Sequence, residues 1–210
     1  MILSLLFSSP VAFFILTGAL LIALTIHEFS HAWMADRLGD PTPRYQDRVT
    51  LDPRAHLDPL GTAALLLIGF GWGKPVQFDP YNLKDPVKDS ALIALAGPAS
   101  NLLLALGVSI LSGATNLLTL INPEIVFTVV FINVMLAIFN LVPVFPLDGS
   151  KIAMALLPKQ LSYEYESFMQ HYGTYVLLIL LIPWSGGRSP ISLLIMPIIT
   201  SVVQTLSVFW

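Results

Sequence analysis

The sequence predicts an all-α polytopic membrane protein with five to six transmembrane helices and a short re-entrant or β-hairpin element. Three observations lead to this expectation. Hydrophobic residues make up 55% of the 210 residues and charged residues only 11%, whereas soluble domains carry about 25% charged residues. The mean hydropathy is +0.77. Several apolar stretches are also long enough to cross a bilayer. A disordered chain and an ordinary cytosolic enzyme are therefore excluded.

The apolar stretches define five expected spans, since a helix needs roughly 20 mostly apolar residues to cross a membrane. In chain order they are residues 11–35, 90–113, 124–142, 171–184 and 191–209. The first is not a signal peptide, because residues 1–10 contain no Lys or Arg. The fourth is short unless it extends upstream into the amphipathic stretch 150–170. No repeat or soluble domain boundary is visible, so we expect residues 1–210 to form one membrane domain.

Residues 60–73 are apolar but too short to span, and they contain four glycines. We expect a re-entrant or interfacial hairpin over about residues 60–76, which is tolerated at membrane depth only where other helices cover it. Its edge could pair with an extended substrate strand. The alternative is a simple plug on the surface.

The basic residues predict the orientation. With the N-terminus outside, segments 36–89 and 143–170 face the cytoplasm and contain nine of the ten Lys and Arg residues, which we interpret as topology determinants. We therefore expect a multi-pass protein of the cell membrane. The net charge of −3 offers no basic footprint for nucleic acid. The absence of cysteine excludes disulfides, thiolate nucleophiles and Cys-based zinc sites. The oligomeric state cannot be read from the sequence.

The first span ends in a motif with metal-binding spacing, His27-Glu28-Phe29-Ser30-His31. On a helix, residues i and i+4 share a face, so both histidines can bind one zinc ion while Glu28 acts on the water bound to it. The alternative is a polar helix end wetted by lipid headgroups. An ionisable residue at membrane depth costs about 2.5–3.5 kcal/mol on insertion scales, which favours metal binding.

A catalytic zinc usually has three protein ligands, and Asp148 is the best candidate for the third. It follows the third span, and the predicted topology ends the first and third spans on the same side of the membrane. A turn aspartate before glycine is the alternative. We expect one zinc ion per chain, although cobalt or iron would fit the same ligands.

Two further residues are candidates for the site. Asn140 could bind the substrate backbone or the oxyanion, or it could form a helix cap or an interhelical hydrogen bond. His56 could be a fourth ligand or a latch on the active site, or simply a loop histidine at an interface. By contrast, the spacing of Gly97 and Asn101 favours close helix packing over catalysis.

The motif HEFSH and the segment NLVPVFPLDG resemble those of the site-2 protease family of intramembrane zinc metalloproteases. RVTLDPRAHLDPLGT, GWGKPV and AGPASN are similar to a small prokaryotic subgroup without a PDZ or CBS domain. The resemblance implies zinc held by His27, His31 and Asp148, with Glu28 as the catalytic base. It also implies cleavage of transmembrane protein or peptide substrates close to the cytoplasmic side of the bilayer.

The expected function is therefore an intramembrane zinc endopeptidase. One alternative is a membrane-bound HExxH peptidase that clears misfolded proteins or signal-peptide remnants. Another is a non-catalytic metal carrier. A transporter usually has polar residues on several spans, whereas here the ionisable residues gather at one level.

Overall fold

The computed structural model describes residues 2–114 and 122–209, which are mostly helical and include no β-strand. The longer helices are α2 (Pro10–Leu38), α5 (Pro86–Ala114), α7 (Pro123–Asn140), α9 (Lys159–Leu181) and α10 (Pro190–Leu206). The shorter ones are α1 (Ile2–Ser8), α3 (Thr42–Tyr45), α4 (Pro59–Ile68) and α8 (Asp148–Leu156). Single 3₁₀ turns are η1 (Pro53–Ala55), η2 (Pro80–Asn82), η3 (Ser185–Gly187) and η4 (Ser207–Phe209). The all-α prediction is confirmed.

Four of the described helices are long and apolar enough to cross a membrane. They are Pro10–Leu38, Pro86–Ala114, Pro123–Asn140 and Pro190–Phe209. Each contains or closely matches one of the predicted spans, so four of the five expected spans are present as helices that could cross a membrane. The expected total of five to six spans is not reached within the described residues.

The predicted span at residues 171–184 is part of α9, which is not one of these four helices. α9 begins after Pro158 and continues past His171 without interruption. Its first half carries Lys159, Glu164 and Glu166, which lower its hydropathy. The boundary expected at residue 171 is wrong because no proline or capping residue separates the polar half from the apolar half.

Residues 60–76 do not form the expected β-hairpin. Pro59 occupies the first turn of α4, and the Asp58 side chain accepts a hydrogen bond from the Gly61 N–H at 2.7 Å. The helix ends at Gly69, whose φ of +84° suits glycine. The chain then returns in extended form with one antiparallel bridge, between Leu57 and Gly73. The capped start favours a helix over a strand here, and membrane re-entry stays a prediction.

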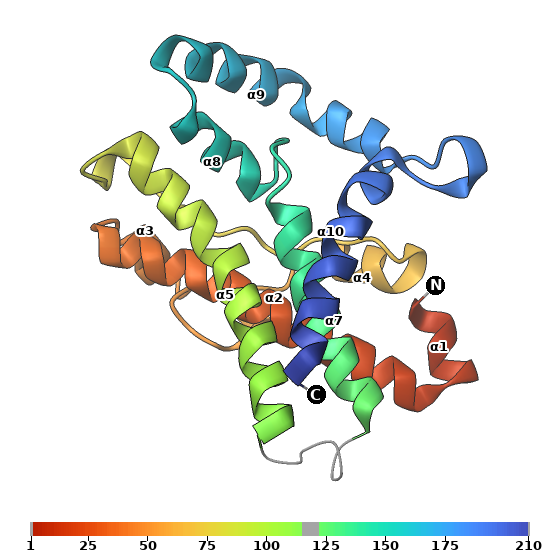
Figure 1. Ribbon diagram of the computed structural model, residues 1–210. Helices are drawn as coiled ribbons and strands as arrows, with labels where there is room; N and C mark the ends of the chain where they lie inside the picture. Colours follow the sequence, from red (N-terminus) through yellow and green to blue (C-terminus); the bar gives the residue numbers. More distant parts are fainter. Residues whose placement is uncertain (1, 115–121, 210) are drawn as a thin grey trace.

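Helices α2, α5 and α7 pack against one another and form the centre of the molecule, with α10 against α7 (Figure 1). On α2 the buried apolar residues are all alanines, among them Ala19, Ala23 and Ala32, which allow the close helix contacts typical of membrane proteins. A second core includes Val130 and Val134 of α7 and Ile195 and Ile199 of α10.

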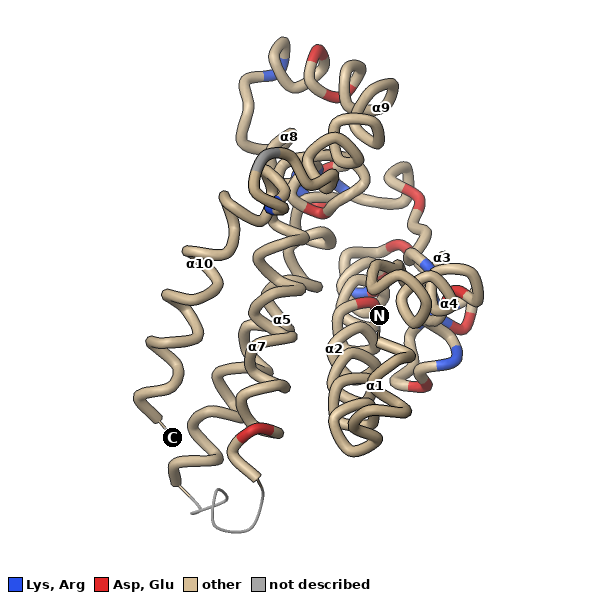
Figure 2. Tube along the Cα trace, turned by 90° about the vertical axis from the view of Figure 1, so that its right-hand side faces the viewer, with Lys and Arg blue, Asp and Glu red and all other residues tan. Residues whose placement is uncertain are grey.

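The charged residues lie mainly at one end of the bundle. Figure 2 shows them around α3, α4, α8 and α9, while the opposite ends of the long helices are almost free of charge apart from Glu124 at the start of α7. Large apolar side chains such as Phe14, Leu103 and Leu194 are 63–67% exposed on the outer surfaces. A lipid environment accounts for such exposed side chains.

Candidate metal centre

The second half of α2 places three titratable side chains at the centre of the bundle. His27, Glu28 and His31 are all buried. The imidazole rings of His27 and His31 lie edge to face, with their centroids 4.6 Å apart, as expected for residues one helical turn apart. The helical HExxH arrangement expected from the sequence is therefore present.

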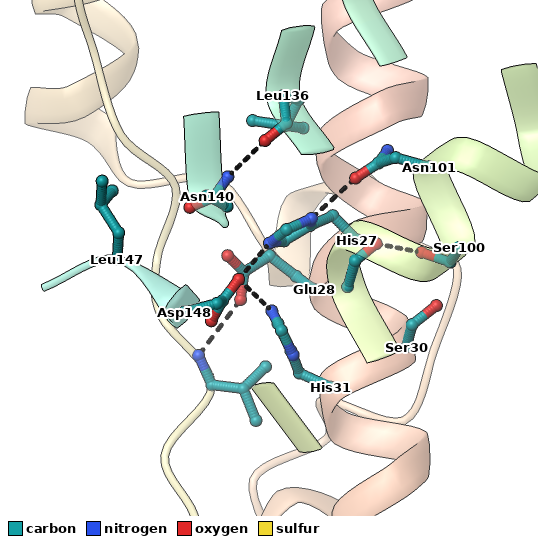
Figure 3. A network of polar contacts seen from close by, with 12 residues as sticks. His27, Glu28, Ser30, His31, Ser100, Asn101, Leu136, Asn140, Leu147 and Asp148 are labelled. Atoms are coloured by element: carbon teal, nitrogen blue, oxygen red, sulfur yellow. Dashed lines mark hydrogen bonds and ion pairs between the residues drawn. The ribbon is translucent and has the colours of Figure 1, made fainter. Parts of the chain in front are cut away.

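Asp148 completes the cluster from a different part of the chain. It is the first residue of α8 and follows the turn that ends α7. Its Oδ2 lies 3.1 Å from His27 Nε2 and 3.2 Å from His31 Nε2 (Figure 3). One ligand atom from each of the three residues lies within 4.8 Å of the others. The structure thus brings together the three side chains predicted as ligands.

The hydrogen bonds behind the histidines test whether a cation fits this cluster. His27 Nδ1 lies 2.7 Å from Asn101 Oδ1, and His31 Nδ1 lies 2.7 Å from the Ile93 carbonyl oxygen. Each partner is an acceptor, so each Nδ1 donates a hydrogen bond and each Nε2 is left to face Asp148. Two imidazole Nε2 atoms and a carboxylate oxygen that converge in this way suit a divalent cation. The donor set fits zinc.

Asn101 has a role that the sequence analysis missed. Its Nδ2 donates to the Ala23 carbonyl at 3.0 Å and to Asn133 Oδ1 at 2.9 Å. Both donor hydrogens are therefore used inside the bundle, and Oδ1 is left to accept from His27. An asparagine in the middle of an apolar span is costly unless it is paired. The presence of an asparagine within an apolar span was therefore the sequence feature that could have identified Asn101 as a residue with a buried polar partner.

Gly97 gives the histidines their space on the α5 side. A Cβ atom at this position would lie 2.4 Å from His31 Nε2 and 2.7 Å from His27 Cε1. A larger residue would therefore displace both histidines. The close packing expected at Gly97 is present, and it lets α5 approach the candidate metal cluster of His27, His31 and Asp148.

Arg48 links Glu28 to residues 74–78, an extended segment that lies beside the site. Its guanidinium donates to the carbonyl oxygens of Lys74 and Pro75, and its Nη2 lies 3.8 Å from Glu28 Oε2. The Val76 N–H donates to the same Glu28 oxygen at 3.2 Å. Burial lowers the pKa of Arg48, and the neighbouring Glu28 opposes that shift. Our interpretation of Arg48 as a topology determinant alone was thus incomplete.

The two remaining candidates lie in different surroundings. Asn140 borders the cavity at the metal cluster, but its Nδ2 donates to the Leu136 carbonyl of its own helix at 2.9 Å. His56 is fully buried outside the cluster, where its Nε2 donates to the Thr50 carbonyl at 2.8 Å. Its own carbonyl accepts from the Lys74 N–H at 2.8 Å. Burial lowers the pKa of His56. With these contacts, His56 is better explained as a residue that supports the segment around Lys74 than as a metal ligand.

Two cavities meet at the site. The smaller, of about 130 Å³, contains the metal cluster together with Glu28 and Asn140. The larger, of about 510 Å³, extends toward α8 and α9. Val76, Phe78 and Lys151 border both cavities. A substrate segment could therefore reach the metal cluster through the larger cavity.

Replacing Asn101 by leucine is expected to weaken zinc binding by about 10–100-fold, because His27 loses the acceptor that fixes its tautomer and orientation. The measurement is competition for zinc with a chelator of known affinity. Ser100→Ala is the matched control, since Ser100 is the preceding residue and, among the described residues, its hydroxyl donates to the Gly97 carbonyl of its own helix. Equal zinc affinity in Asn101→Leu and the wild type would contradict the assigned role.

Comparison with known proteins identifies the family. Residues 108–182 match the model of peptidase family M50. The chain is 35% identical over 176 residues to YwhC of Bacillus subtilis, which carries a provisional zinc metalloprotease name, and the match covers 80% of each protein. The chain belongs to peptidase family M50. It is a zinc metalloprotease of the site-2 protease type, as the sequence resemblance predicted, so the metal-carrier alternative is set aside.

Two other M50 relatives are longer than this chain. Rip2 of Mycobacterium tuberculosis is 33% identical over 140 residues, which are 61% of this chain and 52% of Rip2. Stage IV sporulation protein FB of Bacillus subtilis is 26% identical over 151 residues, 67% of this chain and 50% of that protein. The chain thus spans about half the length of these two family members. No solved structure matches it.

Proposed function

We propose that this M50 member is an intramembrane endopeptidase. It would hydrolyse peptide bonds of membrane-spanning substrates near the cytoplasmic ends of their helices. The observation that carries the proposal is the convergence of His27, His31 and Asp148 beside Glu28, since two of these ligands and Glu28 belong to a helix apolar enough to span the membrane. Residues 1–210 would form one domain with this single site.

In the proposed mechanism His27, His31 and Asp148 hold the metal. Zinc bound there would polarise the scissile carbonyl and lower the pKa of a water molecule. Glu28 Oε2 already accepts the Val76 N–H, whereas Oε1 has no hydrogen-bond partner among the described residues. Glu28 would take the proton of the attacking water on Oε1 and deliver it to the leaving amine. Asn140, at the border of the same cavity, would bind the substrate backbone or the oxyanion.

The substrate has to be extended at the cleavage point, because a helix buries its own amide bonds in hydrogen bonds. The backbone N–H and C=O groups of Gln77 and Phe78 form no hydrogen bond within the described residues, and both residues border the larger cavity. Arg48 holds the carbonyls just before them. We propose that a substrate strand pairs with this edge and so reaches the metal cluster in extended form.

The proposed orientation has the N-terminus outside the cell membrane. α2 then runs toward the cytoplasm and carries His27 and His31 to that side, where the charged end of the bundle lies (Figure 2). The Lys and Arg residues of segments 36–89 and 143–170 support this direction.

Purified protein in lipid vesicles should cleave a membrane-spanning peptide, and chelation of zinc should stop the cleavage. Mass spectrometry of the products locates the bond. A peptide containing only the loop next to the span is the control. Cleavage of the spanning peptide in preference to the loop supports an intramembrane protease. Equal or faster cleavage of the loop would favour the alternative, a membrane-bound peptidase that clears remnants. No zinc-dependent cleavage of either would contradict both.

A further inference from the structure

Lys151 occupies the junction of the two cavities. It belongs to α8, three residues after Asp148, which is about one helical turn. It borders both the metal cavity and the larger one, and no other Lys or Arg of the described residues borders either. A single cation therefore faces the space through which a substrate segment would pass.

Lys151 forms no ion pair with any of the described side chains. Its Nζ lies over the Phe78 ring, 4.3 Å from the centroid. Burial lowers the pKa of Lys151, and the negative charges of Asp148 and Glu28 oppose that shift. A cation removed from water without a partner is costly, so an anion arriving next to it would bind favourably.

The remaining walls of the larger cavity suit a peptide. Phe145, Met154 and Met169 give it an apolar lining, and Gln77 and Phe78 offer backbone groups that form no hydrogen bond with the described residues. Glu166 is the only carboxylate among the described residues that border it, and its Oε1 accepts a hydrogen bond from Gln170. The positive charge of Lys151 thus lies where the larger, mostly apolar cavity meets the cavity of His27, His31 and Asp148.

We propose that Lys151 binds a carboxylate group of the peptide close to the scissile bond. The inference rests on the proposed protease function and names a substrate property of that site. The carboxylate has two possible sources. One is the side chain of an acidic residue near the scissile bond. The other is the new α-carboxylate of the N-terminal product, which cleavage generates next to the metal cluster.

The test uses the full-length zinc-loaded protein and membrane-spanning peptides that carry Glu, Gln or Lys at each position flanking the scissile bond. For the wild type we expect kcat/KM for Glu to exceed that for Gln by about tenfold at one position. Lys151→Met should abolish this preference, Lys151→Arg should keep it, and Lys151→Glu should favour Lys instead. Lys159→Met, at an exposed lysine at the start of α9, is the control and should behave as wild type.

A second arm tests the product. Peptides that end at the scissile residue, with either a free carboxylate or an amide, are compared as inhibitors. Tighter inhibition by the free acid, by about tenfold in the wild type but not in Lys151→Met, assigns the α-carboxylate. A Glu preference in the first arm assigns the side chain.

Either preference, lost in Lys151→Met, supports the proposal. If the wild type cleaves these peptides without distinguishing charge in either arm, or if Lys151→Met keeps the preference, the proposal is overturned while the protease function stands. If the wild type cleaves none of them, the proposed function fails and this inference fails with it. A switch toward Lys in Lys151→Glu cannot result from misfolding, because it is a gain in one substrate over another.

Discussion

Glu28→Gln is expected to lower kcat for a membrane-spanning peptide by about 10²–10⁴-fold while the protein keeps its zinc. Glutamine has the shape of glutamate and can still accept the Val76 N–H through its side-chain oxygen. In this pose the amide NH2 group takes the place of Glu28 Oε1, and it cannot take up a proton from water. The loss therefore affects the proton transfers, and the ligand set of His27, His31 and Asp148 is unchanged. Initial rates and the zinc content of the same sample measure the two properties.

The control for this change is Glu164→Gln, because Glu164 is an exposed glutamate on α9 away from both cavities. It should have the activity of the wild type. Near-normal activity in Glu28→Gln would contradict the assignment of Glu28 as the general base. Loss of zinc together with loss of activity would instead assign it a part in metal binding.

Arg48→Ala is expected to reduce both activity and stability. Its side chain is 3% exposed, and its removal takes the nearby cation away from the Glu28 carboxylate and a hydrogen-bond donor away from the carbonyls of Lys74 and Pro75. Breaking a buried ion pair from one side costs about 3 kcal/mol. The extended segment that borders both cavities would lose its anchor, so kcat/KM should fall more than zinc content. Thermal unfolding in detergent and peptide cleavage measure the two effects.

Arg48→Lys distinguishes positioning from charge, since lysine keeps the positive charge but lacks the planar fork that reaches two carbonyls. It should recover part of the stability and less of the activity. Arg54→Ala is the control, because Arg54 pairs with Asp52 at an exposed site and should leave both properties unchanged. An Arg48→Ala protein as active and stable as the wild type would contradict the anchoring role.

The metal cluster was more predictable than its supports. The spacing of His27 and His31 on one helix and the direction of the spans were enough to group them with Asp148. The role of Asn101 depends on its contact with His27, which joins α5 to α2. The two residues are 74 positions apart in the sequence, so no local pattern reveals the contact. Arg48 could not be distinguished from the other basic residues. Its contact with Glu28 is a tertiary contact between residues 20 positions apart, which the sequence does not show.

The fold was predicted best where apolar runs are long and uninterrupted, as in the four apolar helices. It was predicted poorly where the ends of a helix do not coincide with the ends of an apolar run. α9 is one helix although only its second half is apolar, since helix formation needs no uniform hydropathy. Residues 59–68 form a helix despite Gly61, because the Asp58 side chain caps its start and Pro59 occupies its first turn.

The metal content of purified protein tests the central claim most directly, namely that His27, His31 and Asp148 hold the zinc. Elemental analysis would compare the wild type in detergent with His31→Ala and Asp148→Ala, each shown to be folded by its helical circular dichroism. The account predicts about one zinc per chain in the wild type and a large loss in both variants. Full zinc retention in Asp148→Ala, or a folded wild type that binds no zinc, would contradict it.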